Sequence, residues 1–151
     1  MGKEIGKVKM ENGTPSPHAP VEKISDFTEL ETWKFARALR RQIYSVTRAF
    51  PADEKYGLTS QMRRAGISAT ANIAEGYGRY SYQENLQFCR QARGSLYELR
   101  DHLTTALDAG YLSKEMFAEL DAMAVSATRL INGYIRATKN LKMSMSQRLK
   151  K

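Results

Sequence analysis

A chain of 151 residues is the size of one folded domain, and its single cysteine cannot form an internal disulfide. No apolar run approaches the roughly 20 residues that cross a bilayer, and no signal-peptide pattern opens the chain, so we expect a cytoplasmic protein with no membrane association. The net charge of +8 is compatible with polyanion binding, although a solvated surface explains it equally well.

Residues 1–26 contain three of the four prolines and no hydrophobic periodicity, so we predict a disordered leader. A folded domain is expected over residues 27–140. Its first helix should run from about residue 29 to residue 50, because Thr28 and Glu31 form a capping-box pattern and Pro51 ends the helical sequence. The apolar face of this helix comprises Phe35, Ala36, Leu39, Ile43, Val46 and Phe50.

The second predicted helix, capped by Asp53 and ending near residue 77, has two apolar faces. One comprises Leu58, Met62, Ala65, Ala69, Ile73 and Gly76, and the other comprises Ile67, Ala71 and Ala74. A bundle covers only one face of a helix, so self-association would cover the second, while an exposed run of small residues is the alternative. The polar residues between the faces include Arg64, Asn72, Glu75 and Arg79, which we assign to inter-helix or inter-subunit contacts.

Two further helices follow, each with a good capping serine. Ser81 and Glu84 open the third, which should end near residue 110, and Ser113 caps the fourth. The third-helix seam is Cys89, Ala92, Leu96, Leu99, Leu103 and Ala106; the fourth-helix seam is Met116, Leu120, Met123, Ala127, Leu130, Tyr134 and Ala137. Near-heptad seams joined by short loops predict an all-α, antiparallel up-and-down four-helix bundle.

Arginines interleaved with aromatic residues lie on two helix faces. The third helix carries Arg90, Arg93, Tyr97 and Arg100; the first carries Arg37, Arg40, Arg41, Tyr44 and Arg48 opposite its apolar face. Guanidinium groups bind phosphates and aromatic rings stack on unpaired bases, so both faces are candidate RNA contacts. Ion pairing with Glu98, Asp101 and Asp108 is the alternative for the third helix. Residues 141–151 are expected to form a basic, frayed tail that aids binding without sequence preference.

No catalytic or metal-binding constellation is apparent. His18 and His102 have no ligand at a suitable spacing, and Cys89 falls in an apolar seam. We therefore expect no enzyme activity, no metal and no cofactor.

Four blocks of sequence resemble a known bacterial family. They are residues 27–34 (FTELETWK), 57–65 (GLTSQMRRA), 71–79 (ANIAEGYGR) and 92–99 (ARGSLYEL). In this order they resemble the four-helix bundle proteins encoded in intervening sequences of 23S ribosomal RNA genes. The likeness covers about residues 27–140.

The resemblance implies a ring-shaped homopentamer with a basic surface that faces nucleic acid, and it implies no enzyme activity. The favoured interpretation is a homo-oligomeric scaffold that binds RNA or a nucleoprotein, with binding to DNA left open. The fold also resembles that of the accessory variability determinants of diversity-generating retroelements. The alternative is therefore an accessory protein that binds a reverse transcriptase and its template RNA.

Overall fold

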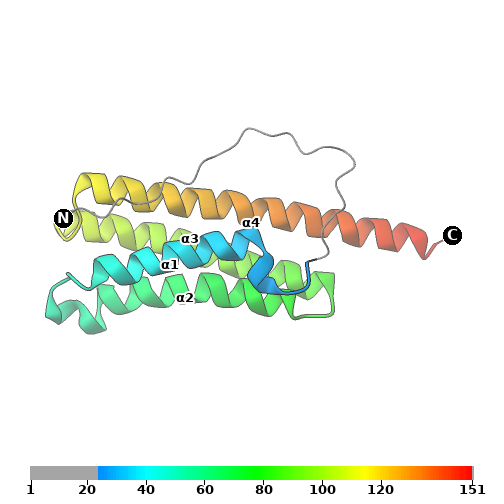
Figure 1. Cartoon of the computed structure of the whole chain (residues 1–151), viewed down its shortest axis with the longest axis horizontal. Helices are drawn as coiled ribbons and strands as arrows, with labels where there is room; N and C mark the ends of the chain where they lie inside the picture. Colours follow the sequence, from blue (N-terminus) through cyan, green and yellow to red (C-terminus); the bar gives the residue numbers. More distant parts are fainter. Residues whose placement is uncertain (1–23, 151) are drawn as a thin grey trace.

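The computed structural model describes residues 24–150 and contains four long helices in that part of the chain. They are α1 (Glu31–Thr47), α2 (Leu58–Tyr77), α3 (Tyr82–Asp108) and α4 (Lys114–Arg148), with short 3₁₀ turns η1 (Phe27–Glu29) and η2 (Ala52–Tyr56) before α1 and α2. Successive helices run antiparallel (Figure 1). The predicted all-α four-helix bundle is confirmed, and the predicted leader up to residue 23 lies outside the described residues.

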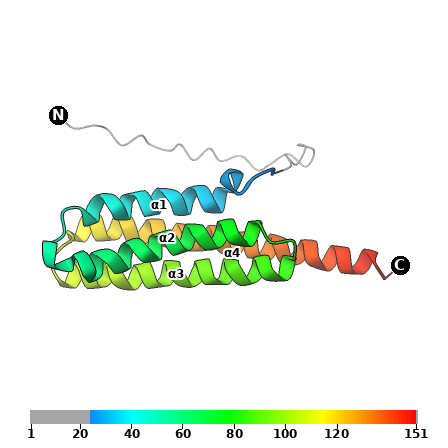
Figure 2. The same cartoon turned by 90° about the horizontal axis from the view of Figure 1, so that it is seen from below.

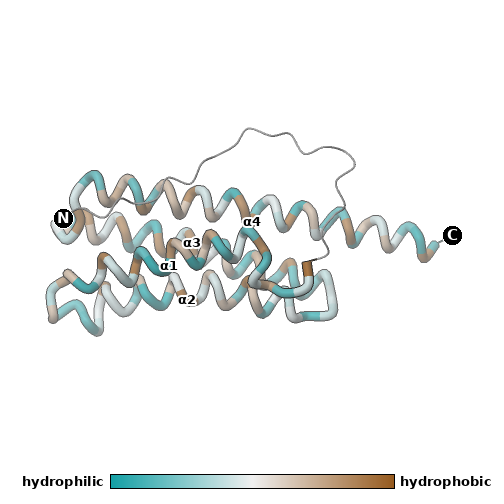
Figure 3. The backbone as a smooth tube through the Cα atoms, viewed as in Figure 1, coloured by the Kyte–Doolittle hydropathy of each residue, from teal (hydrophilic) through white to brown (hydrophobic). Residues whose placement is uncertain are grey.

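Each helix packs against two neighbours and not against the helix diagonally opposite. α2 packs on α3, α3 on α4, and α1 against both α2 and α4, as Figure 2 shows from a second side. Polar and apolar residues alternate along every helix (Figure 3), as expected when each buries one stripe and leaves the rest to solvent. None of the helices in residues 24–150 is long and apolar enough to cross a membrane.

The expected caps hold for α3 and α4 and are wrong for α1 and α2. Ser81 Oγ accepts from the backbone N–H of Glu84, and Ser113 Oγ accepts from that of Met116. The Thr28 hydroxyl instead donates to Asp26, so α1 begins at Glu31 without a side-chain cap. At α2 the carboxylate of Glu54, one residue beyond the expected Asp53, accepts from the backbone N–H of Leu58 at 2.8 Å.

The core seam of α4 is displaced from the expected one. The residues of α4 that are buried are Leu120, Ala124, Ala127, Thr128, Ile131, Ile135 and Thr138. Met116 and Leu130 of the expected seam are each 37% exposed, and Ala137 is also exposed. Leu120 and Ala127 of the expected seam are buried, and Met123 and Tyr134 pack partly buried against the core. The rest of the seam differs because Thr128 and Thr138 pack in the core although their side chains are polar. α4 therefore carries a second apolar stripe, exposed to solvent, that comprises Met116, Leu130, Ala137 and Leu141.

The chain beyond residue 140 continues α4, so the expected tail begins inside this helix. Residues 141–148 are helical and exposed, and this end of α4 projects past the other helices (Figure 1). The Lys142 ammonium donates to Gln83 at the start of α3, which anchors the first turn of the projection. The expected end of the domain helix near residue 140 is thus too early.

Candidate nucleic-acid interface

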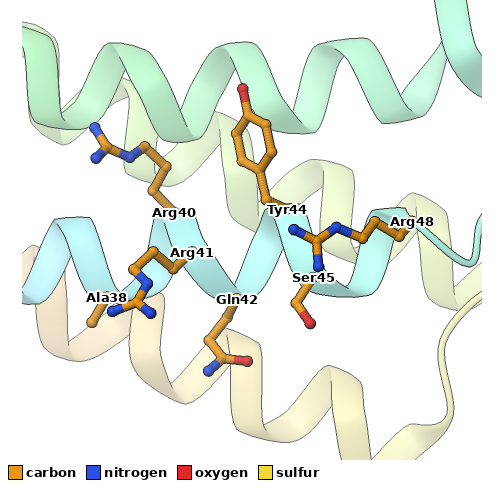
Figure 4. A pocket seen from close by; sticks show the side chains of 7 residues that line it. All are labelled: Ala38, Arg40, Arg41, Gln42, Tyr44, Ser45 and Arg48. Carbon is orange, nitrogen blue, oxygen red and sulfur yellow. The ribbon is translucent and has the colours of Figure 1, made fainter.

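The outward surface of α1 carries arginines without acidic neighbours. Arg37, Arg41 and Arg48 are exposed, and none of them forms an ion pair with a carboxylate within residues 24–150. The reason is visible in the sequence, since no Asp or Glu occurs between Glu31 and Asp53. We call Arg37, Arg41 and Arg48 the α1 basic face. An open hollow of about 630 Å³ lies among the side chains of this part of α1 (Figure 4).

Arg40 and Tyr44 turn away from this face toward α2, as Figure 4 shows. Arg40 Nη1 donates to Thr70 Oγ1 at 2.7 Å. The guanidinium of Arg63 lies 4.8 Å from the centroid of the Tyr44 ring, a cation–π contact that occupies one side of that ring. The expected position of Arg40 and Tyr44, opposite the apolar face, is therefore wrong. Both are half-buried and connect α1 to α2.

The third-helix stripe is largely engaged with α4. Arg93 Nη1 donates to Asn132 Oδ1 at 3.0 Å, and Arg100 binds Asp121 through two hydrogen bonds of 2.7 and 3.3 Å. These hydrogen bonds and the carboxylate charge raise the pKa of Arg100. The ion pair expected as an alternative therefore exists, but its acid lies on α4 and not on α3.

Two residues of the same stripe remain accessible. The Tyr97 side chain is 55% exposed. Arg90 borders a groove of about 450 Å³ between α3 and the end of α4, where it meets Lys139 and Lys142. Arg90 thus shares a groove with two lysines at the basic end of α4, whereas Arg93 and Arg100 bind Asn132 and Asp121.

The four polar residues assigned to helix contacts fall into three separate groups. Arg64 pairs with Glu98 of α3. The Asn72 amide donates to the backbone carbonyl of Ser68 at 2.9 Å and to its hydroxyl at 3.0 Å, and Ser68 in turn bonds to Ser95 of α3. Glu75 pairs with Arg79 at 2.5 Å, and Glu84 lies 3.7 Å from Arg79. All three groups lie on the α2–α3 side of the bundle.

Cys89 and His102 are the cysteine and the histidine of the described chain, and neither is free in a cleft. Cys89 is fully buried, and burial raises the pKa of its thiol to about 11. His102 Nε2 lies 3.3 Å from a Glu98 carboxylate oxygen. Across residues 24–150 no three His, Cys, Asp or Glu side chains cluster as metal ligands would. His18 lies outside the described residues.

Two residues that shape the basic surface were missed from the sequence. Arg63 donates to Thr47 Oγ1 at 2.9 Å and packs on Tyr44, while Asp121 fixes Arg100. Neither has a local sequence signal, since each acts on a residue of another helix. Finding them requires knowing which helix faces meet.

The fold and its surface define a class of protein: an all-α four-helix bundle with a face of arginines that form no ion pair among residues 24–150. Within this class, the chain belongs to the 23S rRNA-intervening sequence protein family, whose model matches residues 28–133. The family resemblance drawn from the sequence is therefore confirmed. No curated protein matches the chain.

A crystal structure with the same fold comes from a protein of unknown function of the S23 ribosomal protein family from Bacteroides thetaiotaomicron VPI-5482. The TM-score is 0.62 at 17% sequence identity, and the match covers 69% of this chain and 97% of that chain. At this identity the likeness supports the four-helix fold alone.

Proposed function

We propose that this chain is a non-enzymatic, homo-oligomeric scaffold that binds RNA through the α1 basic face. The observation that carries the proposal is the set of three exposed arginines, Arg37, Arg41 and Arg48, with no ion-pair partner in the described chain. Surface arginines are commonly neutralised by nearby acids, and those that are not attract polyanions. The name of the family, which refers to 23S rRNA, supports RNA as the polyanion to test first.

The chemistry of this face favours RNA over a generic anion. Arginine offers planar donor pairs that match phosphate oxygens, and its guanidinium plane also stacks on bases. The Arg37 guanidinium already lies 5.9 Å from the centroid of the Trp33 ring, so a ring and a cation stand together at the start of the face. Such mixed surfaces bind unpaired strands with little sequence preference.

The exposed second apolar face of α2 supports self-association into the proposed homo-oligomer. Ile67 on the second apolar face of α2 is 45% exposed, and Ala71 beside it is also exposed. The bundle leaves this face uncovered, and burying it between copies would remove apolar area from water. A closed ring of five copies is the assembly that the family resemblance implies, and it would repeat the α1 basic face around the ring.

The decisive experiment compares two variants that remove equal charge from different helices. One changes Arg37, Arg41 and Arg48 to Gln; its matched control changes Arg90, Arg93 and Arg100 to Gln. Fluorescence anisotropy with an unstructured RNA at several salt concentrations gives the affinity and its salt slope. Each phosphate contact on a single strand contributes about −0.7 to that slope.

We expect the α1 variant to lose up to three contacts, which makes the slope shallower by up to about 2. The α3 variant should lose less, because Arg93 and Arg100 already bind α4. A larger loss in the α3 variant would place the interface on α3, the other face that the sequence offers as a candidate. If the unmodified protein binds no RNA at low salt, the result would favour the alternative, in which the chain is an accessory protein that binds a reverse transcriptase.

A further inference from the structure

An apolar groove at one end of the bundle has no role in the fold or in the α1 basic face. It lies where the start of α1, the turn between α2 and α3, and the second apolar stripe of α4 meet, and its volume is about 930 Å³. This volume is in the range of pockets that bind small organic ligands. We infer that this groove, with Tyr80 at its mouth, is a subsite that takes an unpaired nucleotide of RNA; the inference rests on the proposed function.

Aromatic rings surround the groove. Tyr77 ends α2, Tyr80 and Tyr82 belong to the turn and the start of α3, and Tyr134 comes from α4. Tyr80 is completely exposed, so its ring contributes nothing to the core. A tyrosine with no packing role at the mouth of an apolar groove offers the flat surface on which an unpaired base stacks.

The charges around the groove suit a phosphodiester strand. Arg129 lines it and Arg136 follows two turns later on the same side of α4; both are exposed, and neither forms an ion pair within the described chain. The acid on the rim, Glu31, is paired with Lys34 at 3.1 Å, and Arg79 is paired with Glu75. Arg129 and Arg136 are therefore the cations left to bind phosphate.

The groove and the α1 basic face are separate surfaces. Glu31 and Thr32, which line the groove, lie roughly 120° and 140° around the axis of α1 from Arg37. The charges on α4 therefore indicate the occupant. An apolar protein segment would leave the guanidinium groups of Arg129 and Arg136 without anionic partners, whereas the phosphates of an RNA strand would bind them.

The test uses a ring-deletion variant and a matched control. The test variant, Tyr80→Leu, keeps an apolar side chain and removes the ring. Tyr80→Phe is a control that keeps the ring. Tyr56→Leu is a second control, which removes the ring of another solvent-exposed tyrosine, 86% exposed, in η2. Anisotropy with an unstructured RNA should show roughly 5- to 150-fold weaker binding for Tyr80→Leu with an unchanged salt slope, as expected for one lost stacking contact. Tyr80→Phe and Tyr56→Leu should bind within about twofold of the unmodified protein.

A second variant fills the groove without disturbing the fold. A Cβ at Gly133 would meet only the Arg136 guanidinium, at 3.9 Å, so the backbone has room for a side chain there. Gly133→Leu should keep the Tm and helical circular dichroism of the unmodified protein, which are measured first, and should weaken RNA binding as Tyr80→Leu does. If the unmodified protein binds RNA and both variants bind it equally well, the subsite is overturned and the proposed function stands. If Gly133→Leu changes the oligomeric mass in native mass spectrometry and leaves RNA affinity intact, the groove is an interface between copies. If the unmodified protein binds no RNA, both proposals fail.

Discussion

Breaking the Arg100–Asp121 pair should lower stability and leave RNA binding nearly unchanged. The pair joins α3 to α4 through two hydrogen bonds, with the side chains 35% and 25% exposed. Exposed ion pairs are worth about 0 to 1 kcal/mol, and hydrogen bonds to charged groups about 1.5 to 3 kcal/mol. A two-bond pair of intermediate exposure should therefore have a coupling free energy of about 1 to 2 kcal/mol.

A double-mutant cycle with Arg100→Met and Asp121→Ala measures this coupling, because Met retains the apolar stem of Arg. Each single variant should lower Tm by roughly 3 to 8 °C for a domain of this size. The RNA salt slope of Arg100→Met should match that of the unmodified protein. A coupling below about 0.3 kcal/mol together with a slope shallower by about 0.7 would show that Arg100 contacts phosphate and not Asp121.

Three further predictions concern assembly, the end of α4 and the core. Native mass spectrometry should show one dominant species larger than a dimer. Ala71→Glu should dissociate this oligomer and keep the helical circular dichroism, because burying an unpaired charge between copies is costly. A monomer of the unmodified protein at micromolar concentration would contradict the predicted assembly. Deleting residues 143–151 should weaken binding to all nucleic acids alike and leave Tm nearly unchanged, since these residues are exposed where described; a large fall in Tm would show that they stabilise the bundle. Cys89 should resist alkylation at pH 8 until the protein unfolds, because burial raises its pKa to about 11 and keeps the thiol protonated; rapid native labelling would refute its burial.

The sequence predicted α3 more accurately than α4, and the reason is chemical. Every residue of the expected α3 seam, from Cys89 to Ala106, is buried, because that helix has one clear apolar stripe. On α4 the pattern offers two stripes, and the buried one includes Thr128, whose hydroxyl donates to the carbonyl of Ala124 at 2.9 Å. A threonine satisfied by its own helix can enter the core, which a reading based on apolar residues alone misses.

The sequence identified the arginines of the candidate site but not which of them bind a neighbouring helix. Residue type and spacing identified the arginines of α1 and α3 as candidates. The sequence could not show that Asn132 and Asp121 of α4 bind Arg93 and Arg100, because those contacts depend on how neighbouring helices are turned toward each other. Neither could it show that Arg41 forms no ion pair with an acid of α2 or α4.

The acidic residues of α4 and most of its basic residues lie toward opposite ends of this long helix. Its 35 residues extend for about 52 Å, with Glu115, Glu119 and Asp121 all in its first turns. From residue 122 to residue 151 the chain has seven bases and no acid. Near a polyanion, this separation of acidic and basic charge should turn the basic, projecting end of α4 toward the polyanion. First contact should therefore occur at that end, before the rest of the molecule reorients to bind. At physiological ionic strength, charges are screened over about 8 Å, which confines this steering to the last step of approach and makes the association rate fall as salt rises.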